Sequence, residues 1–293
     1  MNRLLRSKRT IALFVGPALV LFVVFLLVPI VQNVVLSLQR TDLMSPAQFI
    51  GLDNYENLFK DSIFLKSLRN NLLMVVGSFL AHMPLALLLA NILFNRVKGS
   101  RFFQSVFFMP CVVCGVAVGL TWTFIYNSEF GMVNQLLDAL RLTGLKHQWL
   151  SEENTVMVAI IVVVMWQFVG YHMVIQLAAM RGIPGELFEA ATLDGASRWQ
   201  QFRSLTLPLI RPILKVDAVL IITGSLKYFD LVYAMTKGGP NHASEVMSTY
   251  MYYQAFRTMK YGYASAIGNI LLVLCVGAIV ISNYVFKSKK IEY

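Results

Sequence analysis

Residues 154–180 read NTVMVAIIVVVMWQFVGYHMVIQLAAM, and they contain no Asp, Glu, Lys or Arg. A bilayer core of about 30 Å needs roughly 20 apolar residues in a helix, because each residue adds about 1.5 Å. This stretch is therefore long enough and apolar enough to cross a membrane. It is followed by RGIPGELFEAATLDGASRWQQFRSLTLPLIRP, residues 181–212, which is too polar to continue the span. Together the two stretches predict a membrane helix that leads into a long loop.

Five windows of the chain, each 26 to 30 residues long, lack any charged residue. A sixth apolar segment, residues 213–235, contains four charged residues, but its Val, Leu and Ile content suits a span lined partly by protein or water. We therefore expect an all-α membrane protein with six transmembrane helices, forming one domain over residues 1–293. The predicted spans are residues 11–36, 70–95, 102–126, 154–180, 213–235 and 261–286.

The composition supports this class. Hydrophobic residues make up 57% of the chain and charged residues 14%, whereas soluble domains carry about 25% charged residues. The formal net charge is +10, but the Lys and Arg residues lie between apolar runs instead of covering one face of a polar domain. The sequence therefore predicts a lipid bilayer as the surrounding medium and no nucleic-acid partner.

The distribution of basic residues predicts the topology. An even number of spans places both termini on one side, and the segments on that side carry the whole positive excess. By the positive-inside rule this side is the cytoplasm, which predicts a multi-pass membrane protein with both termini inside. The first window is too long for a signal peptide and contains Pro17 and Pro29, so we expect a retained anchor. The basic residues counted on this side are Arg3, Arg6, Lys8, Arg9, Arg96, Lys98, Arg101, Arg181, Arg198, Arg203, Arg211, Lys215, Lys287, Lys289 and Lys290.

The cytoplasmic loop, residues 181–212, predicts two short helices. Pro184 and Glu186 suit the start of the first helix, where proline fits and the helix dipole favours an acid. Asp194 and Gly195 then break the helix, and a second one can begin at Ala196. The expected product is an exposed knob with an apolar surface.

The string EAATLDGASRWQQFRSLTLPLIRP, residues 189–212, resembles the EAA loop of binding-protein-dependent ABC importers, in the form found in carbohydrate permeases of the maltose and glycerol-phosphate type. It combines E-A-A, D-G-A, W-Q-x-F and T-L-P in one ordered string between two spans. The resemblance extends through residues 107–134, 165–173 and 228–256. It implies the permease fold of type I ABC importers, a place in the bacterial inner (cell) membrane, and a role in ATP-driven import of a sugar or related solute.

The resemblance also implies how the permease obtains energy. The chain has no Walker A string, so we expect no enzymatic activity and no bound cofactor, with ATP and Mg held by a partner ATPase. The expected partners are a second homologous permease, two ATPase subunits and an extracytoplasmic solute-binding protein. The residues that the resemblance assigns to the ATPase contact are Glu189, Ala190, Ala191, Asp194, Gly195 and Ala196.

Polar and aromatic residues inside the spans indicate where solute binds, because such groups are costly in a membrane unless they face a cavity. Aromatic faces, an amide and hydroxyls suit a sugar, although packing between helices is an alternative role for each residue. We expect Lys227 and Asp230 to pair with each other at the outer mouth. The residues that the resemblance assigns to solute contact are Gln167, Phe168, Tyr171, Ser225 and Tyr228. We also expect Gly224 to contact solute, because it lies beside Ser225 in the same span.

Two alternative functions fit the sequence less well. An ion-gradient-driven carrier could use intramembrane Asp217, Asp230 and Lys227, but such carriers have inverted repeats, and none is apparent. A membrane enzyme would need paired carboxylates or a metal-ligand cluster, and the sequence predicts neither a catalytic nor a metal site. The C-x-x-C pair Cys111 and Cys114 lies in an uncharged predicted span, so we expect both to be small packing residues.

Overall fold

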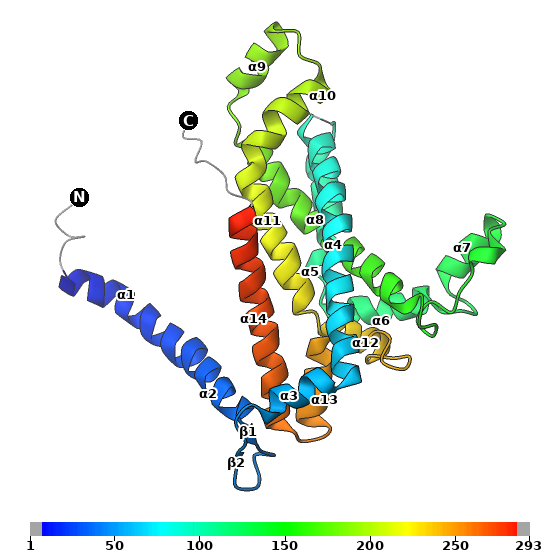
Figure 1. Cartoon of the computed structure of the whole chain (residues 1–293). Coiled ribbons are helices and arrows are strands. Elements are labelled where there is room, and N and C mark those ends of the chain that lie inside the picture. The colour runs from blue at the N-terminus through cyan, green and yellow to red at the C-terminus, as the bar shows by residue number, and fades with distance from the viewer. Residues whose placement is uncertain (1–7, 96, 286–293) are drawn as a thin grey trace. The chain divides into compact units, whose positions relative to one another are not determined.

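The computed structural model describes residues 8–95 and 97–285, and these form helices and one small hairpin (Figure 1). Arg96 and the two charged tails, including Arg3, Arg6 and Lys287, lie outside the described residues. The described chain divides into two compact units. One contains residues 8–61 and 251–270, and the other contains residues 62–250 and 271–285 apart from Arg96.

The first unit begins with one continuous helical segment. It then forms an antiparallel hairpin in which Gln39 pairs with Phe49 and Arg40 with Gln48. The Asp42 carboxylate accepts hydrogen bonds from the backbone N–H groups of Ser45 and Met44 in this turn, and these bonds lower the pKa of Asp42. The elements are α1 (Lys8–Phe22), the π-helical turn η2 (Val23–Leu27), α2 (Val28–Ser37), β1 (Gln39–Arg40), β2 (Gln48–Phe49) and α3 (Asp53–Lys60).

Polar contacts hold this unit together. Asn33 donates to Asn269 over 2.6 Å, and Asn269 donates to the Tyr55 hydroxyl over 2.9 Å. Close backbone approach adds to them, because a Cβ at Gly262 would lie 1.9 Å from the Gln39 carbonyl oxygen. The first helical segment is thereby tied to residues more than 200 positions later in the chain.

The second unit contains most of the helices, and α13 and α14 include residues of both units. Its elements are α4 (Ser62–Phe94), α5 (Ser100–Val112), α6 (Gly115–Ile125), α7 (Met132–Ala139), the 3₁₀ turn η3 (Thr143–Leu145), α8 (Val156–Arg181), α9 (Gly185–Leu193), α10 (Arg198–Gln201), the π-helical turn η4 (Phe202–Thr206), α11 (Leu207–Leu226), α12 (Asp230–Thr236), α13 (Met247–Phe256) and α14 (Tyr261–Val285).

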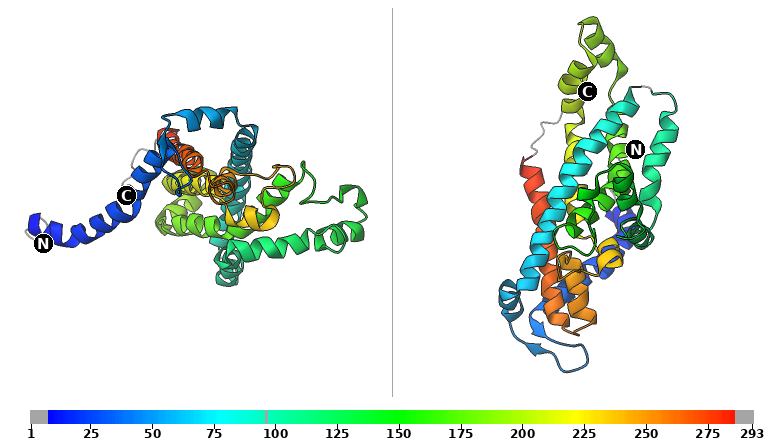
Figure 2. Two further views of the ribbon diagram at one scale, coloured as in Figure 1. Left: turned by 90° about the horizontal axis from the view of Figure 1, so that it is seen from below. Right: turned by 90° about the vertical axis from the view of Figure 1, so that its right-hand side faces the viewer.

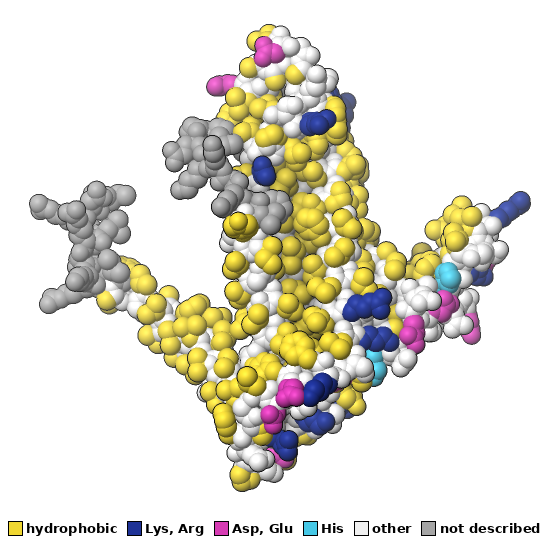
Figure 3. Space-filling view, viewed as in Figure 1, with side chains coloured by type: hydrophobic (Ala, Val, Ile, Leu, Met, Phe, Trp, Pro, Cys, Tyr) yellow, Lys and Arg dark blue, Asp and Glu magenta, His cyan; other side chains and the backbone are white. Residues whose placement is uncertain are grey.

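Helix α8 is the centre of this unit, and it packs against α4, α5 and α11 (Figure 2). Its buried positions join two hydrophobic clusters, one containing Ile160 and Val163 and the other containing Met173 and Met180. The contact with α5 is very close at Gly170, where a Cβ would lie 1.9 Å from the Phe107 carbonyl oxygen. The outward face of α4 makes no such close contact. It is covered by hydrophobic side chains, as is expected of a surface that faces lipid (Figure 3).

Within the described residues, four helices are long and apolar enough to cross a membrane. They lie at Ala12–Ser37, Ser62–Phe94, Val156–Arg181 and Tyr261–Tyr284, and they match four of the predicted spans. A fifth crossing is present if α5 and α6 count as one span, but they meet at an angle of 97°. The prediction of an unbroken helix over residues 102–126 is therefore wrong. Pro110 and the extended backbone at Val113 and Cys114 account for the break.

The predicted helix over residues 213–235 is wrong in both boundaries. Helix α11 begins at Leu207, with Pro208 in its first turn, so the loop after α8 covers residues 182–206 and not 181–212. The helix ends at Leu226, whose carbonyl accepts a hydrogen bond of 3.0 Å from Asn71 of α4. Asn71 is distant in sequence from Leu226, so the pattern of residues around Leu226 could not predict where this helix ends.

Two smaller differences concern the ends of elements. Helix α4 begins at Ser62 and not at residue 70, since its first turns contain Lys66 and Arg69 and extend beyond the apolar window. The hairpin of the first unit also departs from a purely helical fold, although the polar loop that carries it contains the expected short helix, α3.

Candidate functional site

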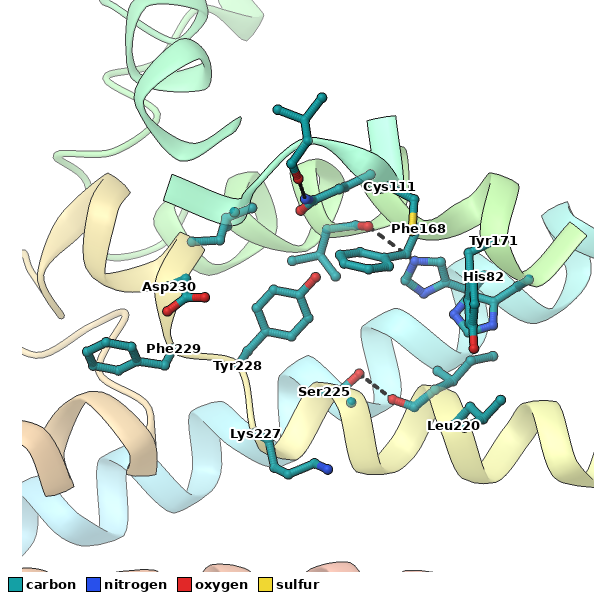
Figure 4. Close-up of a pocket in the computed structure, with 18 of the residues that line it drawn as sticks. His82, Cys111, Phe168, Tyr171, Leu220, Ser225, Lys227, Tyr228, Phe229 and Asp230 are labelled. Atoms are coloured by element: carbon teal, nitrogen blue, oxygen red, sulfur yellow. Dashed lines mark hydrogen bonds between the residues drawn. The ribbon is translucent and has the colours of Figure 1, made fainter. Parts of the chain in front are cut away.

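A cavity of about 580 Å³ opens in the second unit, between α4, α8, α11 and the break between α5 and α6 (Figure 4). Its volume lies within the range of roughly 300–1,000 Å³ that is typical of small-molecule sites. The lining residues are His82, Cys111, Val112, Val113, Cys114, Gly115, Val164, Gln167, Phe168, Tyr171, His172, Leu220, Ile221, Gly224, Ser225, Lys227, Tyr228, Phe229, Asp230 and Leu231.

All six residues predicted to contact solute line this cavity. Gln167, Phe168 and Tyr171 share one face of α8 because they are spaced i, i+1, i+4. On the other side, α11 ends at Leu226, so the chain leaves the helix and brings Tyr228 across the opening. The early end of α11 therefore helps to form the site.

The break between α5 and α6 supplies a wall that sequence reasoning missed. Gln167 is buried and donates from Nε2 to the Val113 carbonyl over 3.1 Å, which satisfies a backbone group freed by the break. Cys111 and Cys114 line the cavity and Cys114 is exposed, so the expectation of two packing residues in a continuous span is wrong. Pro110 was the signal that could have indicated the break.

Two buried polar atoms in the cavity wall have no hydrogen-bond partner in the described part of the chain. They are Gln167 Oε1 and the Tyr228 hydroxyl. The Ser225 hydroxyl instead donates to the Ile221 carbonyl of its own helix over 2.7 Å. The rings of Phe168 and Tyr228 meet edge to face, with centroids 5.9 Å apart. The wall thus combines aromatic surface with unused hydrogen-bonding capacity, which a bound molecule with hydroxyl groups could satisfy.

The charged residues at the cavity do not neutralise each other directly. Lys227 and Asp230 both line it and are exposed, but among the described residues no ion pair joins them. Their side chains point in different directions in Figure 4. The expected pairing at the mouth is therefore wrong, because the turn between the two helices separates the side chains.

The loop after α8 begins as predicted, with a short helix that ends near a glycine. The second helix is not short, because α10, η4 and α11 follow one another without a break from Arg198 to Leu226. Gly195 has φ +76°, a conformation that glycine adopts readily, and its N–H donates to the Thr192 carbonyl over 3.0 Å. Helix α10 then starts with a capping box, in which the Ser197 N–H donates to Gln200 Oε1 over 2.7 Å and the Ser197 hydroxyl oxygen accepts from the Gln200 N–H.

The residues assigned to ATPase contact lie on this loop and are accessible. Glu189, Ala190, Asp194 and Gly195 are exposed, whereas Ala191 and Ala196 are half-buried. Two large side chains that sequence reasoning did not single out are also exposed. These are Leu193, 89% exposed, and Trp199, 66% exposed.

The loop is anchored to the helical core through α9. The Phe188 ring packs on Phe94, at the end of α4, with centroids 5.4 Å apart. Gln201 donates to Thr192 over 3.0 Å and so links α10 back to α9. The knob is therefore internally connected and tied to a long apolar helix.

Residues 62–291 match the family described as "Binding-protein-dependent transport system inner membrane component". The probable ABC transporter permease protein YurN of Bacillus subtilis is 41% identical over 96% of this chain and 97% of its own. The diacetylchitobiose uptake system permease protein NgcF of Streptomyces coelicolor is 34% identical over 88% of this chain and 76% of its own.

Solved structures agree with these sequence matches. A bacterial ABC transporter that imports the acidic polysaccharide alginate has a chain with a TM-score of 0.81 and 26% identity, covering 95% of this chain and 96% of that one. A second alginate transporter structure, in complex with an alginate pentasaccharide-bound periplasmic protein, matches with a TM-score of 0.80 and 26% identity over 92% and 91% of the two chains. The chain thus has the type I ABC permease fold and belongs to the inner-membrane components of binding-protein-dependent transport systems, as a multi-pass transport subunit and not an enzyme.

Proposed function

We propose that this permease forms half of the translocation path for a sugar or related solute, and that Gln167, Phe168, Tyr171, Gly224, Ser225 and Tyr228 contact that solute. The observation that carries the proposal is that all six line a single cavity of about 580 Å³. Relatives whose names include diacetylchitobiose and lactose support a carbohydrate.

The chemistry of the wall supports a sugar. The apolar face of a pyranose packs on aromatic rings, which Phe168, Tyr171 and Tyr228 supply. The unused Gln167 Oε1 and the Tyr228 hydroxyl can bond to sugar hydroxyls. A buried polar atom without a partner costs free energy, so a solute that pairs with it is favoured over an apolar one.

We further propose that the loop at residues 182–206 docks on one of two ATPase subunits that bind ATP and Mg. Glu189, Ala190, Ala191, Asp194, Gly195 and Ala196 form that contact in this proposal. Exposed Leu193 and Trp199 add apolar area on the same knob, and apolar area is typical of a protein interface. A second homologous permease and a solute-binding protein complete the importer, and the alginate transporter complex with its periplasmic protein supports the latter.

The proposed membrane arrangement is one transmembrane domain, residues 1–293, with six spans and both termini in the cytoplasm. In this arrangement α11 supplies the fifth span along the chain, and its Arg211, Lys215 and Asp217 set it apart from the other five spans. Reporter fusions at Lys98, Ser197 and Lys289 should be cytoplasmic, and fusions at Asn57, Gln148 and Ala243 should be external. An external Ser197 would contradict both the topology and the docking of the loop on an ATPase.

The solute site is tested by Tyr171→Ala and Tyr228→Ala in purified complexes. If the two side chains contact solute, uptake falls while the complex assembles and the binding protein still stimulates ATP hydrolysis. If they only pack between helices, the yield of assembled complex falls, because large-to-small core changes cost about 3–5 kcal/mol. Loss of assembly together with unchanged uptake per complex would reject the site.

A further inference from the structure

Asp217 is a carboxylate in the middle of α11, and its side chain is completely buried. Neither the solute site nor the loop uses it in the function proposed above. A buried carboxylate is costly unless both of its oxygens are paired. Its partners therefore show what the residue holds in place.

Both oxygens of Asp217 are paired with the same neighbouring helix. His172 Nδ1 donates to Oδ1 over 2.7 Å, and Gln176 Nε2 donates to Oδ2 over 2.7 Å. His172 and Gln176 are one turn apart on α8, so a single carboxylate bonds to side chains on two successive turns of that helix. All three side chains are buried.

A third helix supports the pair. His82 of α4 packs against the His172 ring with centroids 5.0 Å apart. The two nitrogens of His82 contact the Ser78 and Val164 carbonyl oxygens at 2.8 and 3.3 Å, so this ring is fixed as well. The cluster therefore fixes α8 against α11 while α4 holds the His172 ring.

The position of the cluster links the two sites of the molecule. His82 and His172 line one end of the cavity. Gln176 lies near the end of α8, and α8 and α11 are the helices that enter and leave the loop at residues 182–206. The cluster is thus placed between the loop and the residues proposed to contact solute.

We propose that Asp217, His172 and Gln176 form a clamp that makes α8 and α11 move as one body, so that a displacement of the loop reaches the cavity wall. The proposal rests on the coupling role proposed for that loop. Sliding α8 along α11 would leave the buried carboxylate without donors, and this penalty opposes relative motion of the two helices. Asp217 is therefore a positioning residue for transport.

The test measures solute molecules imported per ATP hydrolysed by the assembled importer in proteoliposomes, with the binding protein present. Asp217→Asn keeps the size of the side chain but removes its charge and one acceptor. The variant should lower this ratio about fivefold or more, the lower end of typical couplings between sites, with the amount of assembled complex held equal. A wild-type ratio would overturn the clamp.

A matched control is Asn70→Leu. Asn70 is also buried, and it donates to the Ala243 and Glu245 carbonyls, but it makes no bond between α8 and α11 and does not line the cavity. It should reduce the yield of complex and leave the ratio unchanged. An equal fall of the ratio in both variants would show that loss of any buried polar contact is responsible, and would also overturn the clamp.

Two further variants keep the test decisive. Gln176→Leu retains the bond between Asp217 and His172. If Asp217→Asn does not assemble, the ratio is measured in Gln176→Leu instead. A wild-type ratio in Gln176→Leu would reject the proposal. Gly195→Pro tests the loop itself. If Gly195→Pro lowers the ratio and the clamp variants do not, the clamp proposal is rejected and the coupling role of the loop is kept. A wild-type ratio in Gly195→Pro would reject both the coupling role of the loop and the clamp proposal.

Discussion

The cavity and the loop at residues 182–206 are served by the same two helices, α8 and α11, but they are built differently. The loop is held mainly by contacts between residues close in sequence, such as Ser197 with Gln200 and Gly195 with Thr192. The cavity is held by contacts between distant residues, such as Gln167 with Val113. Local disruption should therefore damage the loop with little effect on membrane insertion of the permease, whereas changes around the cavity should affect assembly and transport separately.

The largest effect is expected from Gly195→Pro. Proline fixes φ near −65° and has no N–H, whereas Gly195 has φ +76° and donates to Thr192. Uptake should be abolished while the chain is still inserted in the membrane. Gly195→Asn is the matched control, because asparagine tolerates positive φ, and it should keep most of the uptake. Transport assays on membranes with equal permease content compare the two, and wild-type uptake in Gly195→Pro would contradict the role of the loop.

Gly170→Ala should act on assembly. The new Cβ would lie 1.9 Å from the Phe107 carbonyl oxygen, so α5 must move away from α8. Overpacking of this kind costs about 1–3 kcal/mol and should lower the melting temperature of the purified complex. Gly224→Ala is the control, since no atom lies within 4 Å of the new Cβ. Equal melting temperatures for the two variants would show that the close helix contact does not limit stability.

Tyr228→Phe should affect transport and spare stability. The Tyr228 hydroxyl has no partner in the described residues, so its removal breaks no internal hydrogen bond. If solute bonds to it, the KM for uptake should rise roughly 3- to 10-fold, because a hydrogen bond contributes about 0.5–1.5 kcal/mol.

Tyr126→Phe serves as the comparison for Tyr228→Phe. The Tyr126 hydroxyl donates to the Ala159 carbonyl over 3.2 Å and does not line the cavity. Tyr126→Phe should slightly lower the stability of the complex and leave the KM for uptake unchanged. A change of KM in Tyr126→Phe and not in Tyr228→Phe would show that the solute binds elsewhere than at the Tyr228 hydroxyl.

The smallest effect is expected from Ser197→Ala. This change removes the hydroxyl that caps α10, and loss of such a cap costs about 1 kcal/mol. Amide hydrogen exchange at residues 198–201 should become faster while the helices around the cavity keep their protection. Unchanged exchange at these residues would show that the capping box does not hold the loop.

Much of the fold could be predicted from the sequence because a membrane imposes a simple length and polarity rule. The uncharged windows located four of the helices, and Asp194 and Gly195 located the break between the two helices that follow α8. The errors occurred where the chain leaves a helix inside an apolar stretch, at Val113 and at Leu226. At these points the freed backbone groups are paired with Gln167 and Asn71, which are distant in sequence.

The site shows the same division. Residue types and the family resemblance selected six of the residues that line the cavity, since polar and aromatic groups in apolar spans are few. They could not predict the wall formed by Cys111 to Gly115, the separation of Lys227 from Asp230, or the partners of Asp217. The sequence by itself determined the membrane class, most of the helices and the form of the loop, because these depend on local hydrophobicity and backbone preference. Only the tertiary structure decided where the helices break and which polar groups meet, because a buried polar group takes whatever partner the packing of distant helices brings within hydrogen-bond distance.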